Sequence, residues 1–391
     1  MHLSEHNLLE KPMEKQKRIL YITRYSIDEP FNLKKKFDGQ LAAFRSLGYD
    51  VYYIGYDRNR LYLIHDDDKT EYGNTHFRIP SYLHTQFYND LHKAAIKAIK
   101  EIGIDIVYWR SSPLFGSSCK VAETAKKTGT KLIIEIPTFP PNQENNFSGI
   151  RKAFSVYSNH YAPKFHELVD CYVVIGEDAN GKYKGKLAIN IENGIDINSI
   201  SCRDPKLHNN EIHILAVSAM RYWHGYDRLI NSIADYHGKY RVVLHLVGGL
   251  DGECAQQWKQ LAEERGVSDN IIFHGYLYGT DLDDLADLCD IGCASLRRND
   301  FAHVSELKTR EYTARGLPFI LALEDKTFEN AEKQFWYLTS NDESIPDMAE
   351  IVDFALQMRD DKEMIPYMCQ FAEDNLTWEI QYKKLFDAIE L

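Results

Sequence analysis

The most constraining feature of the sequence is an alternation of short apolar runs with segments of helical spacing, which occurs twice along 391 residues. The apolar runs are continuous, as expected for strands buried on both faces of a parallel sheet. Such alternation predicts two doubly wound α/β domains. Strands are expected at residues 18–23, 51–56, 104–109, 131–136, 170–175, 187–191, 212–217, 242–247, 271–274, 291–295 and 319–322. Helices are expected at 39–47, 88–102, 117–127, 226–236, 254–264, 281–288, 307–314 and 378–389.

A polar, unpatterned segment separates the two series of strands and helices and predicts a linker at residues 196–211. The expected organisation is an N-terminal domain at 1–195, a C-terminal domain at 212–375 and a closing segment at 376–391 that carries the last helix. In open α/β sheets, ligands bind at the carboxyl ends of the strands, so loops at those ends are the first places to search for chemistry.

Composition excludes several classes of protein. The formal net charge of −12 disfavours a general nucleic-acid binder, which needs a basic face. No apolar stretch approaches the roughly 20 residues of a membrane-spanning helix, and residues 1–18 lack the apolar core of a secretory signal. The seven cysteines form no CxxC pair, so no zinc site is expected, and their odd number fits a reducing cytoplasm.

Charge is distributed unevenly between the two halves. Residues 1–180 have a balance of +2, with 24 Lys and Arg against 22 Asp and Glu, whereas residues 181–391 have a balance of −14. One interpretation is simple drift between two domains. The other is that the first half faces something anionic, such as a phospholipid surface or a phosphorylated acceptor.

In the second half, two loops follow predicted strands. The loop at 218–225 leads into a helix whose N-terminus suits an anion, and Arg221 and His224 are expected to face that position. The alternative is that Arg221 is a solvated surface group. Gly248, which ends the next strand, either lets a ligand approach the backbone or forms a plain turn.

The predicted helix at 307–314 places Glu311 near an otherwise apolar stripe, where a carboxylate needs a partner. An internal pair with Lys308 or Arg315 would supply one. The functional alternative is a carboxylate that accepts hydrogen bonds from sugar hydroxyls.

Four features in order carry a resemblance to a known family: residues 193–196 (NGID), His224-Gly225, Gly248, and residues 311–318 (EYTARGLP). Together they resemble the retaining, nucleotide-sugar-dependent glycosyltransferases of family 4, in the branch found in bacterial capsule, exopolysaccharide and O-antigen clusters. The segment 273–290 is also similar to that family.

The resemblance implies the GT-B fold, with two Rossmann-like domains facing across a cleft and a C-terminal helix, within residues 376–391, that crosses back to the N-terminal domain. It also implies a UDP- or GDP-linked sugar donor in the second domain, an acceptor in the first, and no metal or other cofactor. In this family Glu311 would bind the ribose hydroxyls, and the backbone near Gly248 and Tyr276 would line the base pocket. The expected donor-binding residues are Asn193, Gly194, His224, Gly225, Gly248, Tyr276, Ser305 and Leu307.

The sequence departs from the family pattern in three places. Val304 stands where the family often has a first glutamate. His224 and Ala219 replace the usual lysine and arginine. We therefore assign the catalytic cations to Arg221 and Lys308, beside Glu311. The departures keep a second hypothesis open, a non-catalytic nucleotide-sugar-binding homologue or scaffold. A third is an epimerase or phosphorylase of the same architecture. A dehydrogenase is disfavoured because no strand leads into GxGxxG.

Acceptor-binding residues are expected in the first half, where loops follow predicted strands: Gly39, Arg110, Glu135 and Thr138. The basic loop before Gly39 has the plain alternative of being merely exposed. The expected acceptor is a glycan or a lipid-linked saccharide. Lysines 93, 97 and 100 share one helix face, for which plain solvation is the default interpretation. The charge asymmetry and a possible lipid-linked acceptor prompt the further expectation of a cytoplasmic protein with peripheral contact to the inner face of the membrane.

Overall fold

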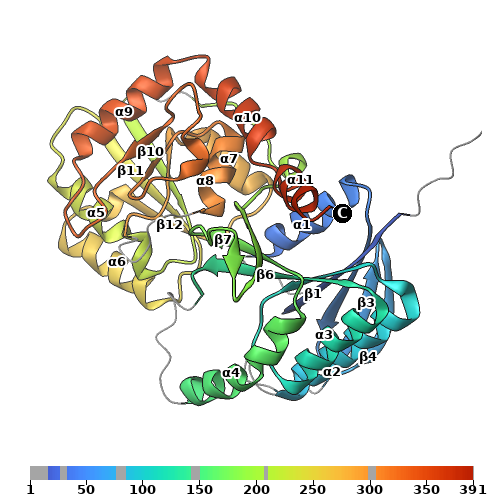
Figure 1. Ribbon diagram of the computed structural model, residues 1–391. Coiled ribbons are helices and arrows are strands. Elements are labelled where there is room, and N and C mark those ends of the chain that lie inside the picture. Colours follow the sequence, from blue (N-terminus) through green and yellow to red (C-terminus); the bar gives the residue numbers. More distant parts are fainter. Residues whose placement is uncertain are drawn as a thin grey trace, which may run out of the picture. The chain divides into compact units, whose positions relative to one another are not determined.

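The computed structural model describes residues 16–26, 33–75, 85–141, 150–206, 210–297 and 305–390. The chain forms two compact units that interleave along the sequence (Figure 1). Unit 1 comprises residues 1–27, 44–133 and 156–168, and unit 2 comprises 28–43, 134–155 and 169–391. Three elements run from one unit into the other: α1 (Lys34–Ser46), β6 (Lys131–Phe139) and α4 (Ile150–Leu168).

In unit 1 the strands follow the order β4-β3-β2-β1-β5-β6. The central strand β1 pairs in parallel with β2 and β5, whereas β3 and β4 form an antiparallel extension that the sequence pattern did not predict. Helices α2 and α3 belong to this unit, and α2 continues into a π-helical turn at Ile99–Gly103. The remaining bounds are β1 Arg18–Ser26, β2 Asp50–Asp57, β3 Arg60–His65, β4 Asp68–Asn74, β5 Ile106–Arg110, α2 Thr85–Ala98 and α3 Gly116–Thr128.

Unit 2 contains two groups of strands. The first consists of the end of β6 with β7 (Cys171–Gly176), β9 (Lys186–Ile191) and β8 (Lys182–Tyr183). The second is a parallel sheet of order β12-β11-β10-β13-β14-β15. Its strands are β10 Glu211–Val217, β11 Arg241–Val247, β12 Ile271–Gly275, β13 Ile291–Cys293, β14 Phe319–Leu321 and β15 Trp336–Leu338. This is the doubly wound order in which the connection reverses between β10 and β13, which predicts a ligand site at their carboxyl ends.

Helices surround the parallel sheet of unit 2, as Figure 1 shows. The sequence predicted α5, α6, α7, α8 and α11 but missed α9 and α10. Their bounds are α5 Tyr226–Asp235, α6 Glu253–Glu264, α7 Thr280–Leu288, α8 Leu307–Arg315, α9 Met348–Asp360, α10 Met364–Asn375 and α11 Trp378–Ala388. The predicted stop of α8 is confirmed, since Gly316 adopts a left-handed conformation at φ +70°. Core strand residues such as Ile214 and Leu244 are fully buried.

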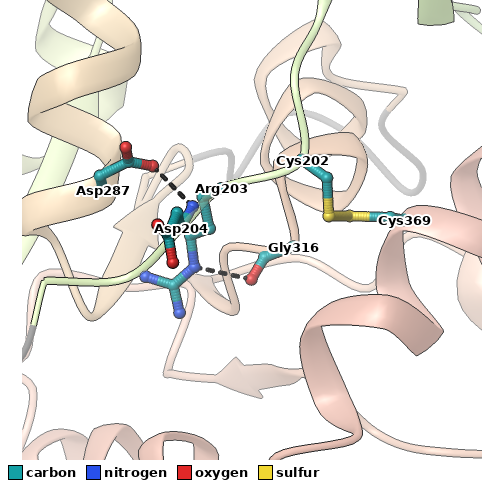
Figure 2. Close-up of a disulfide and its surroundings, with 6 residues drawn as sticks. All are labelled: Cys202, Arg203, Asp204, Asp287, Gly316 and Cys369. Atoms are coloured by element: carbon teal, nitrogen blue, oxygen red, sulfur yellow. Dashed lines mark hydrogen bonds between the residues drawn. A yellow bond between two sulfur atoms is a disulfide. The ribbon is translucent and has the colours of Figure 1, made fainter.

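The predicted linker makes specific bonds within unit 2. A disulfide joins Cys202 to Cys369 of α10 (Figure 2). Next to it, Arg203 Nε donates to the carbonyl of Gly316 at 3.0 Å, and the backbone N–H of Asp204 donates to Asp287 at 3.0 Å. The disulfide contradicts the expectation of a fully reduced set of cysteines. The free cysteines of the described chain are Cys119, Cys171, Cys254, Cys289 and Cys293.

Across the described residues, none of the helices has the length and apolar character needed to pass through a membrane.

Candidate functional site

The carboxyl end of β11 approaches that of β10 closely. A Cβ at Gly248 would lie 1.9 Å from the carbonyl oxygen of Ser218, and Gly248 itself adopts φ +149°. The N–H of Gly248 also donates to the carbonyl of Gly275 at 2.8 Å, which links β11 to the end of β12. Only glycine fits this position, because a side chain would collide with backbone. The predicted importance of Gly248 thus has a local structural cause.

Tyr276 follows β12 at this same edge of the sheet. Its hydroxyl lies against Gly249, where a Cβ would be 2.8 Å from the phenol oxygen. Its ring is 55% exposed and stacks on Tyr278, with centroids 6.1 Å apart and planes 7° apart. Two exposed, parallel rings give this end of the sheet a flat apolar surface of the kind on which a planar base can stack.

The loop after β10 forms a single 3-10 turn, Tyr222–His224. Nδ1 of His224 accepts the backbone N–H of Arg221 at 2.9 Å, so this nitrogen carries a lone pair and the imidazole is neutral, with its proton on Nε2. His224 is buried, whereas Arg221 is exposed. Gly225 follows in a left-handed conformation at φ +65°. The turn therefore leaves Arg221 as its exposed cation and uses His224 to hold its shape.

Backbone bonds fix this turn across the reversal point of the sheet. The N–H of Leu296 donates to the carbonyl of His224 at 3.0 Å, and that of Arg297 donates to the carbonyl of Trp223 at 3.1 Å. The buried Arg297 guanidinium also pairs with Asp227 at 2.8 Å and with Glu343 at 2.7 Å. Its hydrogen bond lowers the pKa of Glu343. Sequence analysis missed Arg297, because Glu343 is remote in the chain.

Helix α8 begins at the end of β13. The carboxylate of Glu306 accepts the hydroxyl of Ser295 at 2.9 Å, and Lys308 Nζ lies 3.4 Å from that carboxylate and 3.2 Å from the Ser295 hydroxyl. Lys308 is thereby held at the reversal point of the sheet, beside an acid. Leu307 opens the helix.

Glu311 is not paired within its own helix. Lys308 pairs with Glu306, and Arg315 forms an ion pair with Asp283. Among the described residues, Glu311 forms an ion pair with Lys35 of α1, with Nζ 3.9 Å from Oε2. The side chain of Glu311 remains 25% exposed. The internal pair considered from the sequence is therefore wrong, and Glu311 keeps accessible oxygens that can accept hydrogen bonds.

Asn193 bridges other parts of unit 2. Its backbone N–H donates to the Ser305 hydroxyl at 2.7 Å, and its Nδ2 donates to the Ser305 carbonyl at 2.5 Å. Its Oδ1 accepts a hydrogen bond from Lys36 Nζ at 2.8 Å. The amide is occupied by these partners. Asn193 and Ser305 thus hold the start of α8 in place, which differs from the direct donor contact expected of them.

Glu135 is fully buried and pairs with Lys36 at 3.5 Å and with Gln40 at 2.8 Å. Its carboxylate therefore has no surface to offer an acceptor, and the predicted acceptor role does not fit. A buried carboxylate needs such partners, because an isolated buried charge is strongly unfavourable.

Gly39 and Gly194 both lie against the indole of Trp378. A Cβ at Gly39 would be 2.8 Å from the ring, and one at Gly194 would be 2.7 Å from the Trp378 backbone nitrogen. These two glycines allow α11 to pack closely against them. In the structure they therefore contact Trp378, and not a ligand as predicted. Arg110 lies half-buried at the end of β5 in unit 1, and Thr138 lies half-buried near the end of β6 in unit 2. Val304 lies outside the described residues.

Arg310 is a further residue that sequence analysis missed. It is fully buried, forms an ion pair with Asp325, and donates to Thr327 at 2.6 Å and to the Asn193 carbonyl at 3.2 Å. It therefore joins the Asn193 turn to the helix that carries Glu311.

No group of three or more His, Cys, Asp or Glu side chains in the described part of the chain is arranged to hold a metal ion.

Part of the chain is similar in sequence to a known protein family. Residues 201–365 match the family model described as Glycosyl transferases group 1. No curated protein sequence is similar enough to this chain to count as a match.

Solved structures extend the similarity along the chain. Sucrose-phosphate synthase from Thermosynechococcus elongatus is 15% identical, with a TM-score of 0.66 over 95% of this chain and 100% of that one. A glycosyltransferase from Rickettsia africae is 16% identical, with a TM-score of 0.64 over 96% and 98%. Anabaena HepE, solved with UDP and glucose, is 14% identical, with a TM-score of 0.58 over 96% and 100%.

The chain therefore has the α/β fold of the GT-B glycosyltransferases, as predicted. Within that class, residues 201–365 are similar in sequence to the group 1 glycosyl transferases.

Proposed function

We propose that the chain is a glycosyltransferase that moves a sugar from a nucleoside-diphosphate donor to a saccharide acceptor, with retention of anomeric configuration. The observation that carries the proposal is the group 1 match at residues 201–365, which contains both the reversal point of the sheet and Glu311. HepE, a structural neighbour, was solved with UDP-glucose, and a starch synthase neighbour was solved with ADP and acarbose.

On the donor side, Glu311 accepts hydrogen bonds from the ribose hydroxyls. Its partly exposed carboxylate beside Lys35 suits this role, because a carboxylate accepts through several lone pairs. The backbone at Gly248 and the ring of Tyr276 line the base. His224 and Gly225 shape the phosphate loop between them.

Bond breaking at the anomeric carbon places negative charge on the leaving diphosphate. Groups that already point at this charge lower the barrier, since they need no reorganisation during the reaction. Arg221 supplies an exposed guanidinium and Lys308 an ammonium, and the N-terminus of α5 adds backbone N–H groups. With these cations in place we propose that no metal ion is required.

The remaining assignments follow the sequence. We propose that residues 1–195 bind the acceptor, that 212–375 bind the donor, and that 376–391 close the structure after a linker at 196–211. Among the predicted acceptor residues, Arg110 and Thr138 are retained. The acceptor is a glycan or lipid-linked saccharide of a bacterial surface polysaccharide. Peripheral contact with the cytoplasmic membrane predicts binding to anionic vesicles at low salt, and failure to bind them contradicts it.

The first experiment measures release of nucleoside diphosphate from UDP-, GDP-, dTDP- and ADP-sugars, with and without EDTA. We expect release from one donor that is unchanged by EDTA. E311Q should lower kcat/KM by about 10- to 150-fold, the range for loss of a charge-assisted hydrogen bond. E263Q, at an exposed position of α6, is the matched control.

The same experiment tests the alternative, a nucleotide-sugar-binding homologue without turnover. The pairing of Lys308 with Glu306 favours this alternative, because it partly neutralises a proposed catalytic cation. Thermal stabilisation by one nucleotide without release from any donor, even with candidate acceptors present, would support it.

A further inference from the structure

Arg24 lies near the carboxyl end of β1 in unit 1, and its surroundings differ from those of other arginines in that unit. We propose that Arg24 is the centre of a binding site for an anionic group on the acceptor, so that the acceptor is an acidic or phosphorylated saccharide. This inference rests on the proposed function, because it names the substrate class of the acceptor side.

Arg24 is half-buried, yet no carboxylate of the described residues lies within ion-pair distance of it. Other arginines of unit 1 do face carboxylates: Arg18 pairs with Asp50, Arg45 with Asp66 and Arg60 with Glu71. Removing a guanidinium from water without a counter-charge is unfavourable. Among the described residues Arg24 has no counter-charge, and an anionic ligand would supply one.

The groups that do face Arg24 are phenols. Its Cζ lies 5.4 Å from the ring centroid of Tyr25, and the hydroxyl of Tyr88 also lies beside it. Burial lowers the pKa of Arg24, but the oxygens of Tyr25 and Tyr88 outweigh this and leave the pKa raised. The guanidinium therefore keeps its full charge at this position.

Buried hydroxyl groups near Arg24 have few polar partners. Among the described residues, Thr23 Oγ1 and Ser112 Oγ make no hydrogen bond, and the buried Tyr88 hydroxyl has only its contact with Arg24. Ile22 of β1 is level with Trp109 of the neighbouring β5, so Thr23 and Ser112 both lie past the last paired residues of these two strands. Buried polar atoms are almost always satisfied, so a cluster of unsatisfied ones indicates a missing partner.

His92 extends this cluster one helical turn further along α2. Its Nδ1 lies 2.8 Å from the Ser117 hydroxyl, while its buried Nε2 has no hydrogen-bond partner among the described residues. Its ring packs against Trp109, with centroids 5.0 Å apart. A neutral imidazole here adds one more unused polar group.

Two helices begin at this edge. Tyr88 lies in the first turn of α2, and its ring contacts that of Phe115, the residue that caps α3, with centroids 5.1 Å apart. Helix N-termini carry partial positive charge and unpaired N–H groups, which favour anions.

These observations favour an anion over a neutral sugar. A neutral sugar would use the hydroxyl groups, but it would leave the guanidinium unpaired. A carboxylate or phosphate matches the planar fork of arginine and accepts from hydroxyls as well. The charge balance of residues 1–180 is +2, against −14 for the rest of the chain, and this difference also favours an anionic ligand in the first half.

The test uses the full-length chain and four probes: glucose 6-phosphate, glucuronate, glucose and inorganic phosphate. Affinities are measured by calorimetry and thermal shift for wild type, R24A, R24K and Y88F. Y88F keeps the buried ring and removes only the hydroxyl, so it remains informative if R24A fails to fold. R45A is the matched control, because Arg45 is an arginine of the same unit that already pairs with a carboxylate, Asp66.

We expect glucose 6-phosphate or glucuronate to bind at least tenfold more tightly than glucose. R24A should weaken that binding tenfold or more, Y88F several-fold, and R24K less than R24A, whereas R45A should leave it unchanged. Equal binding of glucose and both acidic sugars would overturn the proposal, as would equal effects of R24A and R45A. Inorganic phosphate bound as tightly as glucose 6-phosphate would overturn the acceptor assignment, because it would show a site for free anions.

Failure of the glycosyltransferase assignment is separable from failure of this inference. If acidic sugars bind through Arg24 but no nucleotide binds and no donor is turned over, the anion site stands and the transferase assignment fails. If a donor is turned over with neutral acceptors only, and R24A is without effect, the transferase stands and the anion site fails.

Discussion

Arg221 and Lys308, the two cations assigned to the leaving diphosphate, have different surroundings. Arg221 is exposed at the turn after β10, whereas Lys308 lies beside Glu306. We expect R221A to lower kcat by about 10²–10³, since loss of one preorganised donor to a developing charge typically has this effect. K308A should lower kcat less, because Glu306 already partly neutralises the positive charge of Lys308.

Steady-state kinetics with the preferred donor measure both effects, with circular dichroism to show that the variants are folded. R265A on the surface of unit 2, where the arginine pairs with Asp235, is the control. Wild-type turnover in both R221A and K308A would show that the cation assignment is wrong.

Gly248 gives a second prediction at the scale of a single residue. A Cβ there would lie 1.9 Å from the Ser218 carbonyl oxygen, and φ +149° is unfavourable for any other residue. We expect G248A to destabilise unit 2 by about 2–4 kcal/mol, through overpacking and backbone strain. Urea denaturation measures the change.

G252A provides the comparison, because a Cβ at Gly252 meets nothing within 4 Å and its φ is −77°. It should cost less than about 1 kcal/mol, the loss expected at a helix N-cap. Equal losses in the two variants would mean that the close approach of β10 and β11 is not what requires Gly248.

At the scale of elements, periodicity predicted the parallel strands well, because each is a continuous apolar run with a clear boundary. The antiparallel β3 and β4 were missed. The residues of β4 are mostly exposed and polar and carry no core pattern, whereas β3 is short and apolar, with Leu61 and Ile64 buried, and has no helix before it to mark it as a strand of the parallel series. Helix α8 was placed correctly, but its contacts were not. The pairing of Glu311 with Lys35 depends on tertiary structure across more than 270 positions, which local spacing cannot supply.

The same limit applies to the buried polar groups of the site. Glu135 lies near the end of the strand predicted at 131–136 and was taken for an exposed ligand. Its real partners, Lys36 and Gln40, lie on a helix predicted to begin only at residue 39. The His213–His245–His274 ladder likewise depends on strand register, with ring nitrogens 2.8 and 2.9 Å apart across β10, β11 and β12. The sequence alone located the carboxyl ends of the strands. It did not show which side chains there already have hydrogen-bond or ion-pair partners within the protein.

The Cys202–Cys369 disulfide gives a prediction about α10. It closes a loop with a sequence separation of 167, and loss of a native cross-link typically costs about 2–5 kcal/mol, in part by releasing the unfolded chain. We expect the C202S/C369S double variant to have a lower Tm than oxidised wild type. A reductant should lower the Tm of wild type toward that of the variant and leave the variant unchanged.

The variant keeps the other five cysteines, so it controls for effects of the reductant on them. Thiol counting in denaturant completes the test. Seven free thiols in protein purified without reductant would show that the pair does not form and would restore the expectation of fully reduced cysteines.

At the scale of the whole molecule, two compact units mean that unfolding need not be a single transition. A pH dependence can be assigned to one of them. Burial lowers the pKa of His92, in unit 1, to about 3. An unfolded histidine has a pKa of about 6.5, so below that pH the unfolded state binds a proton that the folded state does not. The stabilisation from a neutral His92 is therefore complete above pH 6.5 and is lost as the pH falls from 6.5 toward 3.

The expected slope from this residue is about 1.4 kcal/mol per pH unit in that window. Carboxylates with lowered pKa, such as Glu211 and Asp361, lose their contributions only below their ordinary values of 4.5 and 3.8, so the interval from pH 6 to 5 is governed by histidines. We expect H92N to be less stable than wild type at pH 7.5. Between pH 6 and 5, however, its free energy of unfolding should fall by about 1.4 kcal/mol less per pH unit than that of wild type. H160N, at an exposed histidine of the same unit, should keep the wild-type slope. Urea unfolding at several pH values measures these slopes. If the H92N substitution changes only one of two unfolding transitions, that transition belongs to unit 1. An unchanged slope in H92N would show that His92 is not the neutral, buried group that its packing requires.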